Sequence, residues 1–272
     1  MPSRLYFTMM NKNSYSYLLS HHRLLWRISI NELRGRYAGA LLGKAWIVLA
    51  PLLILGVYAI IYTLIFEVRP TDIGRLQYVL HLFAGMIPFL MMNESLANGV
   101  VSVVSNKAVL NNTVFPIDLA PPKAVLMAQG TIVAGFISIF TIEAITFTVP
   151  WTFIFFPVIW GLSLLALSGL AWILSMLNVV FRDLKDLISV IMMMLFIASP
   201  IAYTPSMVPD SLKFLLLLNP FAYYVSAFQA VTVHGRLPGV FHILFLFVFS
   251  FGLFFLGSWV FSRSKRVLID YV

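Results

Sequence analysis

The segment AWIVLAPLLILGVYAIIYTLIF, residues 45–66, decides the class of fold. It carries no charged side chain, and its one proline, Pro51, lies near its start. A helix that crosses the hydrocarbon core of a bilayer needs about 20 predominantly apolar residues. Residues 45–66 are therefore predicted to form a membrane-spanning helix.

Comparable apolar stretches recur along the whole chain. Only 10% of the residues are charged, against about 25% in a typical soluble domain. The sequence therefore predicts an all-α membrane protein, one domain of residues 1–272 with six transmembrane helices. A shorter stretch that contains Pro200 is included among them. Besides residues 45–66, the predicted spans are residues 79–104, 124–147, 154–180, 187–203 and 241–261.

Residues 14–37 have a different pattern from the predicted spans. Apolar residues such as Leu18 and Trp26 recur at helical spacing, and Arg23 and Arg27 fall on the opposite side. An amphipathic helix with a basic polar face lies in the plane of the membrane interface. We expect an interface helix here.

Residues 206–236 contain two apolar stretches that are each too short to span. Asn219-Pro220 separates Ser211–Leu218 from Phe221–Val233. Two half-length helices that enter and leave the membrane on one side fit this pattern, provided that they pack against protein. The sequence predicts an outward-facing re-entrant pair before the last span.

The distribution of basic residues predicts the orientation. Cytoplasmic loops carry an excess of Lys and Arg, which also accounts for the net charge of +8 without nucleic acid. The start of the chain shows no cleavable signal peptide. We therefore expect a multi-pass protein of the bacterial inner membrane with both termini in the cytoplasm. Of the 18 Lys and Arg residues, all lie on the predicted cytoplasmic side except Arg69, Arg75, Lys213 and Arg236.

No stretch of the sequence predicts ATP hydrolysis or metal binding. Gly39 to Ala45 superficially resembles a phosphate-binding loop, but three residues instead of four separate its glycines, and Ala45 follows Lys44 in place of Ser or Thr. Cysteine is absent and the histidines are scattered. We expect neither a catalytic residue nor a bound metal or cofactor.

Polar and aromatic side chains within the spans indicate a path for a polar molecule. Glu94 and Asn98 lie one turn apart on one helix face, and an ionisable residue in a span is either paired or functional. Tyr58 and Tyr62 also lie one turn apart, with Trp46 at the other end of the same span. Aromatic rings could line a sugar path, or they could form the interfacial belt and core packing.

A basic group lies at the predicted cytoplasmic interface. Arg34, Arg36 and Lys44 could attract a lipid-linked anionic headgroup, because each basic residue near an anionic surface contributes about 1 kcal/mol. Anchoring by the positive-inside rule explains the same residues equally well.

Several short motifs, in order along nearly the whole chain, resemble one family. The sequence is similar to the permease subunits of type-2 ATP-binding-cassette exporters of cell-surface polysaccharide, such as O-antigen, capsule or teichoic acid. The residues that carry this resemblance are Arg36–Gly39, Leu42–Trp46, Phe66–Arg69, Gly85–Phe89, Phe115-Pro116, Phe181–Leu184, Ser199–Tyr203, Val208-Pro209 and Leu218–Phe221.

The resemblance implies how such a chain works. It implies a homodimer of this chain with two copies of a separate subunit that binds ATP and Mg. The implied substrate is a lipid-linked polysaccharide, O-antigen. Loop 105–123 would dock on the ATP-binding subunit, and the re-entrant pair would form an outer gate. The implied coupling residues are Asn106, Lys107, Phe115, Pro116 and Asp118. The implied gate residues are Pro209, Asn219, Pro220 and Phe221. The implied path residues are Trp46, Tyr58, Tyr62, Phe89, Glu94 and Asn98.

Two alternative functions stay open at the level of the sequence. A permease of the same type could export a small drug or lipid. A membrane-embedded glycosyl or phosphoryl transferase would need clustered acidic residues, for which Asp183 and Asp186 are the candidates. The basic neighbours Arg182 and Lys185 favour a solvated loop instead.

Overall fold

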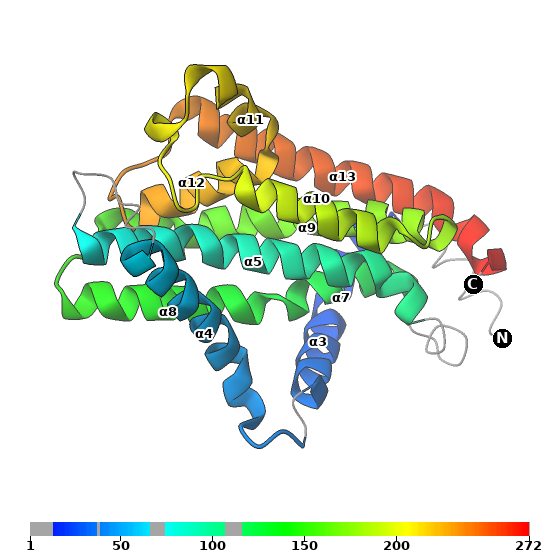
Figure 1. The fold of residues 1–272 in the computed structure, drawn as a ribbon. Helices are drawn as coiled ribbons and strands as arrows, with labels where there is room; N and C mark the ends of the chain where they lie inside the picture. Colours follow the sequence, from blue (N-terminus) through cyan, green and yellow to red (C-terminus); the bar gives the residue numbers. More distant parts are fainter. Residues whose placement is uncertain (1–12, 37–38, 66–73, 107–115, 272) are drawn as a thin grey trace.

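The computed structural model describes residues 13–36, 39–65, 74–106 and 116–271. Within these ranges the regular structure is helical throughout, and the long helices run side by side in an elongated bundle (Figure 1). We call the end that carries Ser14, Asn106 and Lys265 the base, and the end that carries Arg75, Phe147 and Arg236 the far end. The α-helices are α2 Ser14–Ser20, α3 His22–Arg36, α4 Trp46–Ile60, α5 Arg75–Ser105, α7 Ala120–Met127, α8 Gln129–Ile145, α9 Phe156–Val180, α10 Leu184–Ile197, α11 Lys213–Leu218, α12 Pro220–Thr232 and α13 Val240–Tyr271.

Five helical segments are long and apolar enough to cross a membrane. They lie over the predicted spans 45–66, 79–104, 124–147, 154–180 and 241–261, with bounds that differ by a few residues. The segments are Trp46–Ile65, Arg75–Ser105, Ile117–Ile145, Trp151–Val180 and Val240–Lys265. The fold is therefore that of an all-α membrane protein.

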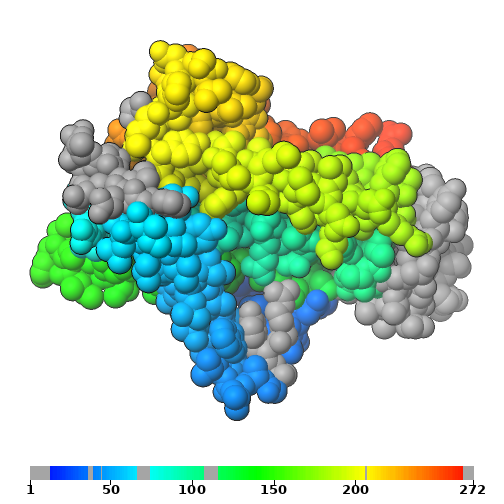
Figure 2. Space-filling model, in the orientation of Figure 1, coloured from blue at the N-terminus to red at the C-terminus, as the bar shows by residue number. Residues whose placement is uncertain are grey.

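Helix α5 forms the centre of the bundle. Most of its side chains are buried, and Leu82, Met86 and Met91 are fully buried. The helix contacts α7, α8, α9, α10 and α12. Helix α4, by contrast, is mostly exposed and leans away from the bundle (Figure 1), and in the space-filling view it projects from the body of the molecule (Figure 2).

Helices α9 and α13 cross at their closest approach through two glycines. A Cβ atom on Gly257 would lie 2.2 Å from the carbonyl oxygen of Gly169, and one on Gly169 would lie 2.2 Å from that of Leu253. Small residues let helix backbones come this close in membranes, where dispersion contacts drive helix association.

The predicted span 187–203 is helical for only part of its length. Helix α10 starts earlier, at Leu184, and ends at Ile197, so its 14 residues cover about 21 Å of a hydrocarbon core of about 30 Å. Residues 198–203 continue toward the far end without helical structure. Side chains of other helices bind their carbonyl groups: Gln229 Nε2 donates to Pro200 O at 3.0 Å, and the Tyr78 hydroxyl donates to Ala202 O at 2.9 Å. Irregular backbone at membrane depth is viable because such partners satisfy it.

The chain then turns back into the bundle. Asn219 returns to the end of α10, where its Nδ2 donates to Ser199 Oγ at 2.9 Å and to Leu195 O at 3.2 Å. Its Oδ1 accepts from the backbone N–H groups of Phe221 and Ala222 and so caps α12. The axis bends by 94° at this residue, and α12 runs along α5 toward the far end.

The predicted interface helix 14–37 consists of two helices. Helix α2 ends at Ser20, and α3 begins at His22 and runs across the direction of the bundle (Figure 1). Ser20 Oγ donates to Tyr17 O at 3.0 Å, and His21 Nδ1 lies 3.1 Å from the same oxygen. Side chains that bond to nearby carbonyl groups compete with the helical ladder, which explains the interruption that helical spacing alone does not predict.

Candidate functional site

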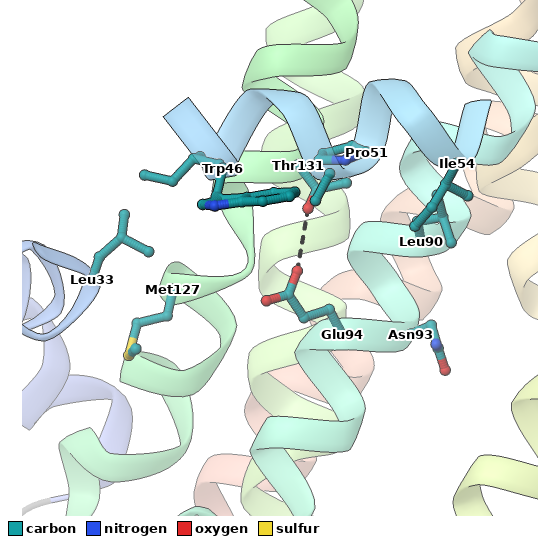
Figure 3. Close-up of a pocket in the computed structure, with 12 residues that line it drawn as sticks. Leu33, Trp46, Pro51, Ile54, Leu90, Asn93, Glu94, Met127 and Thr131 are labelled. Atoms are coloured by element: carbon teal, nitrogen blue, oxygen red, sulfur yellow. Dashed lines mark hydrogen bonds between the residues drawn. The ribbon is translucent and has the colours of Figure 1, made fainter. Parts of the chain in front are cut away.

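A cavity of about 310 Å³ lies between α4, α5 and α8 (Figure 3). Trp46 and Glu94, which the sequence analysis places on a substrate path, both line it. Thr131 Oγ1 of α8 donates a hydrogen bond to Glu94 Oε2 at 3.2 Å. Gly130 keeps α4 close to α8, because a Cβ atom there would lie 2.7 Å from Ile47 Cγ2. The cavity therefore combines an acidic group, a hydroxyl group and an indole ring.

Polar residues near this cavity lie on the accessible side of α5. Asn93, Glu94 and Asn98 are partly exposed, whereas Ser95, Leu96 and Gly99 beside them are buried. Glu94 and Asn98 are four residues apart and so lie one turn apart on the same face, and Asn93 lines the cavity beside Glu94. The face runs from the cavity toward the base and gives a buried helix a polar, accessible stripe.

The other predicted path residues form a separate aromatic cluster nearer the far end. The ring of Tyr58 lies 6.2 Å from that of Tyr62 and 6.0 Å from that of Phe196. Phe89 lies 5.2 Å from Phe196 and 6.3 Å from Phe221. The cluster thus joins three path residues to one predicted gate residue. Sequence reasoning missed Phe196, which lies in an apolar run with no distinguishing signal.

The remaining predicted gate residues differ in exposure. Asn219 is buried and holds the turn between α11 and α12, and Pro220 begins α12. Pro209 is exposed in the preceding segment. The structure therefore brings Asn219, Pro220 and Phe221 together at mid-depth of the bundle and places Pro209 apart from them.

Two polar networks, each around a buried lysine, hold the base together. In the first, Lys123 Nζ bonds Glu32 Oε2 at 2.6 Å and Asn106 Oδ1 at 3.1 Å, and so joins α3, α5 and α7. In the second, Lys265 Nζ lies 3.0 and 3.3 Å from the two carboxylate oxygens of Asp118, and Ser14 Oγ donates to Asp118 Oδ1 at 2.6 Å.

Asp118 is buried, unlike a residue that would contact the ATP-binding subunit directly. Its side chain is only 8% exposed, and its backbone carbonyl accepts a bond from Trp172 Nε1 at 3.0 Å. Burial, followed by the negative charge of Asp118, raises the pKa of Tyr17 on α2. Asp118 therefore ties α2 and α13 to the segment at residues 116–119 from within.

Several predicted residues are only partly described. Pro116 is partly exposed, and Lys107 and Phe115 lie outside the described residues. Arg34 is exposed on α3. The side chains of Arg36 and Lys44 also lie outside the described part of the chain.

Comparison with known proteins agrees with this architecture. Residues 23–233 match the family model described as ABC-2 type transporter. The O-antigen export system permease protein RfbA of Klebsiella pneumoniae is 27% identical over 255 residues, which cover 89% of this chain and 92% of that protein. The protein of the same name in Myxococcus xanthus is 26% identical over 252 residues, which cover 92% and 95% of the two chains. Since the family model covers most of the chain, this protein belongs to the ABC-2 type transporter family.

Proposed function

We propose that this chain is the permease subunit of an ATP-driven exporter that moves a lipid-linked polysaccharide, O-antigen, across the inner membrane. The curated relatives are named O-antigen export system permease proteins and align over nearly their full length. In the proposed complex two copies of this chain assemble with two copies of an ATP-binding subunit, which supplies hydrolysis. The base faces the cytoplasm, in line with the asymmetry of Lys and Arg.

The observation that carries the proposal is the polar stripe of α5 beside the cavity of Trp46. A glycan cannot cross hydrocarbon and needs an enclosed path with hydrogen-bonding groups. Asn93, Glu94 and Asn98 supply such groups, and the indole of Trp46 offers an apolar face for the C–H side of a sugar ring. The two protomers would face each other across this stripe, and the aromatic cluster at Phe89 would continue the path toward the far end.

A complementation experiment tests this function. A strain that lacks the chain should lose surface O-antigen on lipopolysaccharide gels, and the parent chain should restore it. Trp46→Ala should reduce the amount about twofold to tenfold, because an aromatic contact contributes about 0.5–1.5 kcal/mol. Trp259→Ala is the matched control, since that indole is 56% exposed on the outside of α13. Each variant should still copurify with the ATP-binding subunit.

Two outcomes would contradict the proposal. Unchanged surface polysaccharide in the deletion strain would remove the export function. Increased sensitivity to small toxic compounds, with O-antigen intact, would indicate a drug exporter of the same family instead.

A further inference from the structure

Two histidines meet at the far end of the bundle, where α12 ends against α5. His81 Nδ1 of α5 lies 3.0 Å from Nε2 of His234, which follows α12. The ring centroids are 5.0 Å apart, and His81 is only 2% exposed. This contact joins the exit end of the re-entrant segment to the central helix.

The surroundings of Gln229 determine which ring nitrogen carries the proton. Its Nε2 lies 3.0 Å from Pro200 O and 3.3 Å from His81 O, and carbonyl oxygens accept only from a donor. The same amide nitrogen lies 3.4 Å from His81 Nε2 and does not accept hydrogen bonds, so this contact favours the tautomer of His81 that carries its proton on Nδ1. In that tautomer Nδ1–H of His81 donates to Nε2 of His234. The bond needs one ring nitrogen that accepts, so it is lost only when both rings are protonated.

The charged and titratable neighbours oppose protonation of this pair. From α5, the Tyr78 ring stacks on His81 with centroids 6.4 Å apart and stays a neutral phenol at physiological pH. From the segment after α12, the positive charge of Arg236 acts on His234. Burial, followed by that charge, lowers the pKa of His234 below its ordinary value of 6.5. Gln229, from α12, does not titrate.

We propose that His81 and His234 form a proton-sensitive latch that holds the re-entrant helix α12 against α5. One added proton leaves the pair intact, because an imidazolium ring still donates to the neutral ring beside it. When both rings are protonated every ring nitrogen is a donor, so Nδ1–H of His81 and Nε2–H of His234 face each other near the positive charge of Arg236. Acid on the far side that protonates both rings therefore loosens α12 and, through Gln229, the irregular segment at Pro200. The inference concerns the fold alone and does not depend on which substrate is moved.

Electron paramagnetic resonance of a spin label on α12 tests the latch. The chain contains no cysteine, so Ser226→Cys supplies a single thiol on a partly exposed position of α12. The full chain, labelled at about pH 7.5 in nanodiscs and then titrated to about pH 4, should show about a twofold increase in the mobile fraction of the label as both rings become protonated. His234→Gln keeps an acceptor for His81 but cannot take up a proton, and should abolish the change.

Two further variants make the outcome decisive. His242→Gln is the matched control, because His242 also contacts α12, with its Nε2 3.0 Å from Tyr223 O. It should leave the pH response intact. His81→Gln should abolish the response as His234→Gln does, and serves if His234→Gln fails to reconstitute. A response that disappears only in His242→Gln, or that persists in both variants of the pair, would overturn the proposal.

Discussion

Removal of one partner of the buried ion pair at the base should destabilise the protein strongly. Lys265 and Asp118 have side chains that are 3% and 8% exposed, with Nζ 3.0 Å from the nearer carboxylate oxygen. Lys265→Met leaves the carboxylate in a buried site with the Ser14 hydroxyl as a remaining donor. Loss of one member of such a pair costs about 3–5 kcal/mol, because the other charge stays desolvated and uncompensated.

The expected loss of stability of Lys265→Met should appear as a lower melting temperature. For chains of this size about 1 kcal/mol corresponds to about 2–4 °C, so Lys265→Met should melt about 6–20 °C lower. Fluorescence-detected size-exclusion chromatography after heating, on the purified complex, would measure the shift. Lys213→Met is the matched control, since the pair between Lys213 and Asp210 is equally direct, at 2.6 Å, but 51% and 93% exposed. An exposed pair contributes about 0–1 kcal/mol, so this variant should melt close to the parent.

A double variant separates charge burial from packing. Asp118→Asn combined with Lys265→Met removes both charges and should recover most of the stability lost in Lys265→Met. Equal melting shifts for Lys265→Met and Lys213→Met would refute the reasoning. So would a double variant that is less stable than either single variant.

Three other substitutions test contacts that hold the helices together. Gly257→Ala should lower the free energy of unfolding by about 1–3 kcal/mol or more, because its Cβ would lie 2.2 Å from Gly169 O. The control is Gly252→Ala on the same helix, whose Cβ would meet nothing within 4 Å, and it should be neutral in the same melting assay. Asn219→Ala should lower stability by about 0.5–2 kcal/mol through loss of the α12 cap, and Asn219→Ser, which keeps an acceptor, should lower it less; equal losses would contradict the cap. Gln229→Leu should cost about 1–3 kcal/mol by leaving Pro200 O without its donor, and should make residues 198–203 more accessible to hydrogen exchange; unchanged exchange would contradict this bond.

The apolar spans could be predicted because their signal is strong and local. In a bilayer each backbone group must be satisfied within the segment, so a long uncharged run such as residues 45–66 leaves little choice but a helix. The helix break at Asn219-Pro220 could also be predicted from the sequence, because proline lacks an N–H group and asparagine caps the helix that follows.

The features that were missed depend on contacts between distant residues. The end of α10 at Ile197 is stable only because Tyr78 and Gln229, far away in sequence, bind the carbonyl groups that follow it. The burial of Asp118 depends on Ser14 and Lys265, which lie near opposite ends of the chain. The predicted path residues fall into two groups, a cavity at Trp46 and an aromatic cluster at Phe89. This division depends on the tilt of α4, which hydropathy does not determine.

The irregular segment at residues 198–203 can act as a hinge near the far end of the bundle, because a change in its backbone direction needs little free energy. Within a helix, a change of backbone direction breaks a cooperative series of bonds. Here Tyr78 and Gln229 each bind a single carbonyl group of the segment, and Asn219 of the returning chain binds Ser199. The segment can therefore move by exchanging these side-chain partners. Each such bond has a net contribution of about 1 kcal/mol when the released groups find new partners, so exchanging all three would require about 3 kcal/mol. A difference of that size leaves an open state as a minor but accessible population.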